Sequence, residues 1–130
     1  MKLSKAIVCR GVDDNFAPIP IVQPIQSDDK IVGIFIDCVD IKEESVVLRV
    51  LWIHWSGFEI EEKAEYLNAP NRITVCPHIS PIVVQAQEGL TPSGKWDVIV
   101  YYNDNEIFRC SLDIMQSKNT NSSKFMDIIV

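Results

Sequence analysis

The stretch KWDVIVYYNDNEIFRCSLDI, residues 95–114, indicates the fold class most clearly. Apolar side chains recur at every second position on both sides of a polar Asn-Asp-Asn triplet at residues 103–105. A period of two is typical of a half-buried β-strand, and a short Asn/Asp-rich connection between two such runs is typical of a hairpin. We therefore predict two antiparallel strands, at residues 95–102 and 107–114.

Other strand-like segments precede this hairpin, and polar turns separate them. We predict them at residues 6–9, 30–41, 46–55, 73–79 and 82–87. Segment 46–55 is unusual because it is apolar on both faces except at Arg49 and His54. Such a strand is either central and covered on both faces, or it lies at an interface.

Residues 58–68 fit two kinds of structure. Ser56 and Glu59 have the spacing of a helix capping box, and apolar residues follow at helical intervals. The same residues also alternate between apolar and charged, with Glu62 as the single break in the alternation. Because the surrounding chain is all β, we favour a strand.

Seven or eight short strands without a clear helix predict an all-β protein, a β-sandwich, with a small β-barrel as the alternative. The length of 130 residues fits a single domain, which we place at residues 1–115. Segment 13–28 contains three prolines and is predicted to be a loop. Residues 116–130 are predicted to form a flexible polar tail that ends in a short apolar segment.

Three motifs together resemble a group of small bacterial β-sandwich domains of unknown function with immunoglobulin-like topology. The motifs are AIVC at 6–9, KIVGIF at 30–35, and PSGKWDVIVY at 92–101 with the hairpin and Phe108 after it. The resemblance spans most of residues 5–115. It implies an immunoglobulin-like β-sandwich of seven to eight mostly antiparallel strands, in which the ring of Trp96 fills the core, and it supplies no catalytic residues.

The charge pattern disfavours several partners. Twelve basic and eighteen acidic residues give a formal net charge of −6, and the basic residues are scattered singly. Nucleic acids and anionic membranes are bound through clustered cations, so we expect neither as a partner. No apolar run approaches the roughly 18 residues of a membrane span, and the N-terminus has no signal-peptide core. We therefore expect a cytoplasmic protein.

The cysteines and histidines offer little catalytic chemistry. Four cysteines, at positions 9, 38, 76 and 110, occur singly in strand-like segments, which predicts reduced, buried thiols. Cys76 and His78 flank a proline, and a thiol near an imidazole suggests a nucleophile pair. No oxyanion motif or glycine-rich elbow accompanies them, so a Cys/His hydrolase-like enzyme is only the third hypothesis. We expect no catalytic residue, no cofactor and no metal.

The segment WIHWSGF, residues 52–58, supplies the candidate contacts for a partner or ligand: Trp52, His54, Trp55 and Phe58. One tryptophan is expected in the core and the other at an exposed edge, where aromatic rings anchor partners. We predict a non-enzymatic protein-interaction or structural module that self-associates, through an edge strand or an apolar sheet face, as a homodimer or with another protein. The alternative is a β-sandwich that binds a small ligand or carbohydrate.

Overall fold

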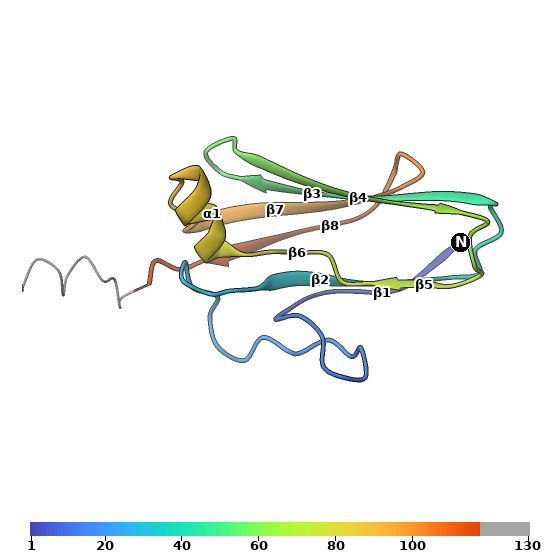
Figure 1. The fold of residues 1–130 in the computed structure, drawn as a ribbon, viewed down its shortest axis with the longest axis horizontal. Coiled ribbons are helices and arrows are strands. Elements are labelled where there is room, and N and C mark those ends of the chain that lie inside the picture. Colours follow the sequence, from blue (N-terminus) through green and yellow to red (C-terminus); the bar gives the residue numbers. More distant parts are fainter. Residues whose placement is uncertain (118–130) are drawn as a thin grey trace, which may run out of the picture.

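The computed structural model describes residues 1–117, which form two facing antiparallel sheets (Figure 1). The first sheet has the order β1-β2-β5, with β6 also paired to β2, and the second has the order β4-β3-β7-β8. The strands are β1 (Lys2–Cys9), β2 (Val32–Val39), β3 (Ser45–His54), β4 (Glu59–Leu67), β5 (Ile73–Val75), β6 (His78–Ile79), β7 (Gly94–Tyr102) and β8 (Asn105–Ile114). Within the described residues the sheets do not close into a barrel, so the predicted all-β sandwich is confirmed.

The core lies between the two sheets. Strand β3 buries every second residue toward it, from Val46 to His54, while the intervening residues, such as Val47 and Arg49, stay half-buried on the opposite face. Trp96 is fully buried on β7, the strand next to β3. Within residues 1–117 no second layer covers the outer face of segment 46–55, so the first of the two explanations for its apolar faces, cover on both sides, is not seen there. The other explanation, that this outer face lies at an interface with a second chain, stays a prediction.

Segment 58–68, which fits both a helix and a strand in sequence, forms a strand, as we predicted. Strand β4 pairs with β3 in a register that places Ile60 opposite Trp52 and Tyr66 opposite Val46. The alternation of apolar and charged residues therefore outweighs the helix signals in this segment, because β3 supplies the backbone hydrogen bonds of a strand. The break in the pattern, Glu62, falls on the inner face of β4, opposite Val50.

Segment 82–87 is not a strand, and this prediction is wrong. It lies in the helix α1 (Pro81–Glu88), with Pro81 in its first turn and Gly89 ending it at a positive φ of 63°. Proline at the start and glycine just past the end are helix signals that outweigh the β-branched residues between them. No helix within residues 1–117 is long and apolar enough to cross a membrane.

Two predicted strands have different limits in the structure. Strand β1 extends the predicted strand 6–9 back to Lys2. The predicted strand 73–79 is divided, because Cys76 and Pro77 separate β5 from β6. Proline lacks the amide hydrogen that a regular ladder requires, which explains the interruption.

The proline-rich segment covers the outer face of the first sheet (Figure 1). Its Phe16 ring packs against Phe35 of β2 with the ring centroids 6.1 Å apart. Arg10, just before the loop, contacts its far end, since its guanidinium donates to Asp29 Oδ2 at 2.8 Å and to the Gln23 carbonyl at 2.7 Å. The loop predicted at 13–28 therefore acts as a partial third layer.

The chain stays packed past the end of β8. The Met115 amide donates to the carbonyl of Ile25 at 2.8 Å, and the buried Ser117 donates its amide to Ser27 Oγ at 2.9 Å. The packed part thus reaches two residues beyond the predicted boundary at 115. The rest of the predicted tail, residues 118–130, lies outside the described residues.

Candidate functional site

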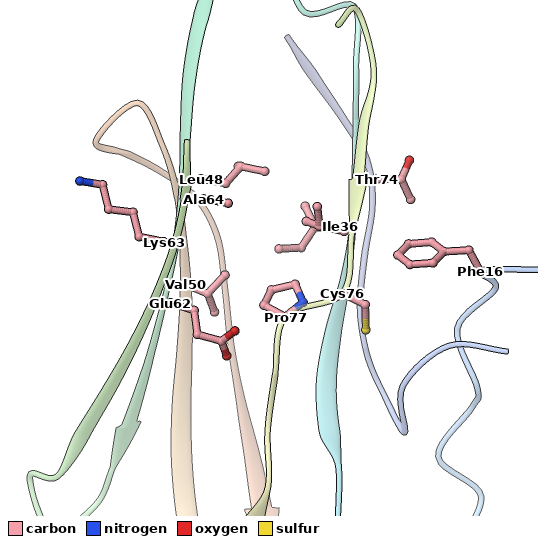
Figure 2. Close-up of a pocket in the computed structure, with 11 residues that line it drawn as sticks. Phe16, Ile36, Leu48, Val50, Glu62, Lys63, Ala64, Thr74, Cys76 and Pro77 are labelled. Carbon is pink, nitrogen blue, oxygen red and sulfur yellow. The ribbon is translucent and has the colours of Figure 1, made fainter. Parts of the chain in front are cut away.

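A cleft of about 320 Å³ opens between the sheets on the side where β4 faces β5 (Figure 2). These two strands are edges of different sheets and do not pair with each other. Apolar side chains from both sheets, including Ile36, Leu48 and Val50, line the cleft. Figure 2 shows Glu62 and Pro77 entering it from opposite sides. The site is therefore an apolar gap with one carboxylate.

Glu62 lacks a hydrogen-bond partner for one of its oxygens. Among the described residues, neither the buried Oε1 of Glu62 nor the buried Nε1 of Trp52 forms a hydrogen bond. Burial raises the pKa of the Glu62 carboxyl, while nearby His78 and Trp52 oppose part of this rise. A half-buried carboxylate without a full set of donors favours a ligand that supplies a proton or an N–H group.

A second hollow, of about 280 Å³, continues toward α1. Phe58 and Ile60 of the β3–β4 hairpin line it together with His78 and with Val83 of the helix. Glu62 borders this hollow as well as the first cleft. The carboxylate therefore stands at the junction of the two apolar spaces.

Trp52 and His54, both candidate contacts from the sequence, are buried in the structure. His54 Nε2 donates to the Ser93 carbonyl at 2.8 Å, because a carbonyl oxygen only accepts. Its Nδ1 is then the acceptor for Ser56 Oγ at 2.7 Å. His54 thus ties the end of β3 to the segment before β7, and neither residue presents a surface to a partner.

Trp55 is the exposed member of the four candidates, with 71 % of its surface accessible. Its indole lies over Gly94, where a Cβ atom would overlap the ring, and its Nε1 donates to the Ser93 carbonyl at 3.3 Å. The fourth candidate, Phe58, is half-buried in the hollow beside α1. The four candidates therefore lie in three different places. Two are in the core, Trp55 is on the surface, and Phe58 lines the hollow beside α1.

The sequence motif Cys76-Pro77-His78 does not bring its thiol and imidazole together. The partner of the Cys76 thiol is Cys9, at 3.5 Å between the sulphurs, and His78 is an exposed residue of β6. Sequence reasoning missed this thiol pair, since its members lie 67 positions apart. It also missed the cleft position of Glu62, although the break in the alternation was a usable signal.

Two antiparallel four-stranded sheets packed face to face define an immunoglobulin-like β-sandwich. The structure is similar to that of an immunoglobulin-like protein from Pseudomonas aeruginosa, with a TM-score of 0.55 and 13 % sequence identity. The match covers 85 % of this chain and 97 % of the other. It confirms the fold and the resemblance stated from the motifs. No protein-family model matches the sequence, and no curated protein matches it as a relative.

Proposed function

We propose that the protein is a non-enzymatic immunoglobulin-like module that self-associates by pairing strand β8 with β8 of a second copy. The observation that carries this proposal is the pattern of charge along β8. The edge strands of the two sheets are the places where a second copy can pair, because an unpaired edge strand presents free backbone donors and acceptors.

The other edges carry features that oppose pairing. Strand β1 has an irregular register between Leu3 and Lys5, and it exposes Lys2 as well as Lys5. Strands β5 and β6 have three and two residues. Strand β4 places the charged Glu62 on its inner face. Bulges, lysines, short strands and inward charges are all known protections against edge pairing.

Strand β8 lacks these protections over its second half. The shift in its register with β7 lies at its start, between Glu106 and Phe108, and the pairing is regular from Phe108 to Ile114. Its inner residues Phe108, Cys110 and Leu112 are only half-buried, although they pack against the core. A second strand beside β8 would complete their burial.

The charges of β8 are self-complementary. In an antiparallel pair of two β8 strands centred on Ser111, Arg109 of each copy lies opposite Asp113 of the other, and Cys110 lies opposite Leu112. Within its own chain Arg109 also donates to Glu106 Oε1 at 2.7 Å. Cross-strand pairs of opposite charge contribute about 0.2–1 kcal/mol each, and two-fold symmetry forms every pair twice. On β4, by contrast, the same arrangement centred on Lys63 places Glu61 opposite Glu65.

The proposal is tested by reversing the charges one at a time and then together. Arg109→Asp and Asp113→Arg each place like charges across the pair, so each shifts the protein toward monomer, whereas the double variant R109D/D113R restores the dimer. Sedimentation velocity between about 10 μM and 1 mM measures the populations. Lys63→Asp, on the opposite edge of the same sheet, is the matched control and leaves the dimer intact.

Two results would contradict the proposal. The first is a wild-type protein that stays strictly monomeric across this concentration range. The second is a dimer that both single reversals leave unchanged, which would place the contact on another surface, such as the one around Trp55.

A second candidate function, binding of a small ligand, rests on Oε1 of Glu62 in the inter-sheet cleft, which has no hydrogen-bond partner among residues 1–117. A volume of about 320 Å³ fits a small, mainly apolar molecule, and the carboxylate favours an amine or another hydrogen-bond donor at one end. Hexylamine and hexanol, compared by calorimetric titration, test this function. If hexylamine binds the wild type and Glu62→Gln abolishes this binding, the result supports ligand binding as the function. If neither probe produces heat, this function is rejected.

A further inference from the structure

Two thiols from distant parts of the chain meet on the outer face of the first sheet. Cys9 ends β1 and pairs with Gly33 of β2, while Cys76 lies beyond the other edge of β2, between β5 and β6. Their sulphurs are 3.5 Å apart. Figure 2 shows Pro77 pointing toward the facing sheet and Cys76 pointing to the opposite side.

Gly33 makes this contact possible. A Cβ atom at this position would lie 3.0 Å from Cys76 Sγ and 3.2 Å from the Pro77 carbonyl oxygen. The intervening strand therefore carries no side chain at the point where the thiols meet. The local backbone is held as well, since the Ile34 amide donates to the Pro77 carbonyl at 2.9 Å.

The two sulphurs differ in protonation and in access. The hydrogen bond from Cys76 lowers the pKa of Cys9 to about 6, and the same contact raises the pKa of Cys76. Cys9 has no exposed surface, whereas Cys76 is half-buried. The contact thus favours the thiolate form of Cys9 and the thiol form of Cys76, and a reagent reaches the pair through Cys76.

The other two cysteines form a useful contrast. Burial raises the pKa of Cys38 to about 11 and also raises that of Cys110. Both side chains pack in or against the hydrophobic core. These two thiols therefore stay protonated and pack as apolar side chains, unlike Cys9 and Cys76.

We propose that Cys9 and Cys76 form a reversible disulfide by exchange with a low-molecular-weight disulfide such as oxidised glutathione. Cys76 Sγ attacks one glutathione sulphur as its proton passes to Cys9, and the first glutathione thiolate leaves. Cys9 then gives that proton to the released glutathione thiolate and attacks Cys76 Sγ, which expels the second glutathione thiolate. Two protein thiols are oxidised, and one oxidised glutathione is reduced to two thiols.

The geometry requires only a local movement. The sulphurs must approach by about 1.5 Å to reach the S–S bond length of roughly 2.05 Å. Cys76 and Pro77 lie outside the regular strands, so a small movement of Cys76 leaves the β1–β2 and β2–β5 ladders intact, while the Ile34–Pro77 hydrogen bond holds the adjacent backbone. The bond joins β1 to the β5–β6 connection across β2, within one sheet, whereas the disulfide of antibody domains joins the two sheets.

The test uses the full chain, oxidised glutathione, and alkylation of the remaining thiols before tryptic mapping. Each cysteine falls on its own tryptic peptide, and Cys9 and Cys76 lie in peptides 6–10 and 73–95. We expect these two peptides to be linked, two of the four thiols to be lost, and dithiothreitol to reverse the change. The midpoint of urea unfolding shifts upward in the oxidised form, because the cross-link restricts the unfolded chain.

Matched variants decide whether this pair is specific. The double variant C38S/C110S keeps the linked peptides and the shift in the midpoint, whereas Cys9→Ser and Cys76→Ser each abolish both. Gly33→Ala slows formation of the bond at least tenfold. A folded wild-type protein that retains all four thiols, or links that involve Cys38 or Cys110 equally, would overturn the proposal.

Discussion

Asp37 is a buried charged residue that three side-chain hydrogen bonds hold in place. Its side chain is buried on the outer face of β2, and it accepts hydrogen bonds from Arg72 Nε at 2.9 Å and Arg72 Nη2 at 2.8 Å. Thr74 Oγ1 donates a third, also at 2.9 Å. These contacts with the Arg72 guanidinium, helped by Thr74, hold the pKa of Asp37 below its usual value of 3.8.

We predict that Asp37→Asn lowers the free energy of unfolding at pH 7 by about 1–3 kcal/mol, the usual cost of disrupting hydrogen bonds to a buried charged group. Because the folded state lowers the pKa of Asp37, its contribution is complete above pH 3.8 and is lost as the pH falls through the lowered pKa. Urea unfolding at pH 7 and pH 3 measures both effects. The exposed Asp28→Asn control should change neither.

Glu62 has the opposite linkage, since its pKa is raised in the folded state. The folded protein therefore binds the proton more tightly, and stability falls as the pH rises from about 4.5 through the raised pKa. We predict that Glu62→Gln removes this slope and increases the free energy of unfolding at pH 7 by about 1 kcal/mol. Urea unfolding between pH 4 and 8 tests the slope, and an unchanged slope would reject the assignment to Glu62.

At the residue level, alternation in the sequence predicts which face a side chain occupies but not what it touches. Trp52 and His54 share the inner face of β3, yet the hydrogen bonds of His54 to Ser56 and Ser93 depend on how two distant segments meet. The Cys9–Cys76 contact depends on the same kind of packing. Such contacts arise from tertiary structure, which a single sequence pattern does not encode.

Among the elements, the β7–β8 hairpin was predicted most fully, because its signals are local. Asn103 and Asp104 both have positive φ angles, of 46° and 67°, as the favoured two-residue hairpin turn requires. The helix α1 was missed, although Pro81 and Gly89 marked both of its ends. Its β-branched residues favour a strand locally, but no neighbouring strand is available to pair with them in the described structure.

We predict that Asp104→Gly stabilises the protein by about 0.5–1 kcal/mol, since glycine adopts a positive φ without steric cost. Asn103→Gly is the matched control at the adjacent position. Asn103 Oδ1 accepts the Val47 amide at 2.8 Å, so this change removes a hydrogen bond and gives no such gain. Thermal unfolding of both variants makes the comparison, and equal stabilisation by both would contradict the role given to Asn103.

For the whole molecule, composition and alternation were sufficient to predict a β-sandwich. The pairing of β3 with β7 and the position of the proline-rich segment over β2 were not predicted. Both depend on contacts between segments far apart in the sequence. Strand order in an antiparallel sandwich is set by such long-range packing. The fold class could therefore be predicted from the sequence, whereas the order of the strands could not.

Self-association also has a consequence for the stability of the whole molecule. If folded chains pair through β8 and unfolded chains do not, mass action makes the melting temperature depend on protein concentration. We predict that Tm rises with concentration between about 10 μM and 1 mM for the wild type, and stays constant for Arg109→Asp. Scanning calorimetry at several concentrations measures the effect, and a constant wild-type Tm would count against the dimer.

The sheet order β4-β3-β7-β8 also has implications for the rate of folding. The β3–β4 and β7–β8 hairpins close over short connections, whereas β3 and β7 meet only after the long segment between the hairpins has been brought into a loop. Closing that loop carries the larger entropic cost, so we expect the docking of the two hairpins to limit the rate. Substitutions at the β3–β7 contact should then slow folding, while those in β1 should mainly accelerate unfolding.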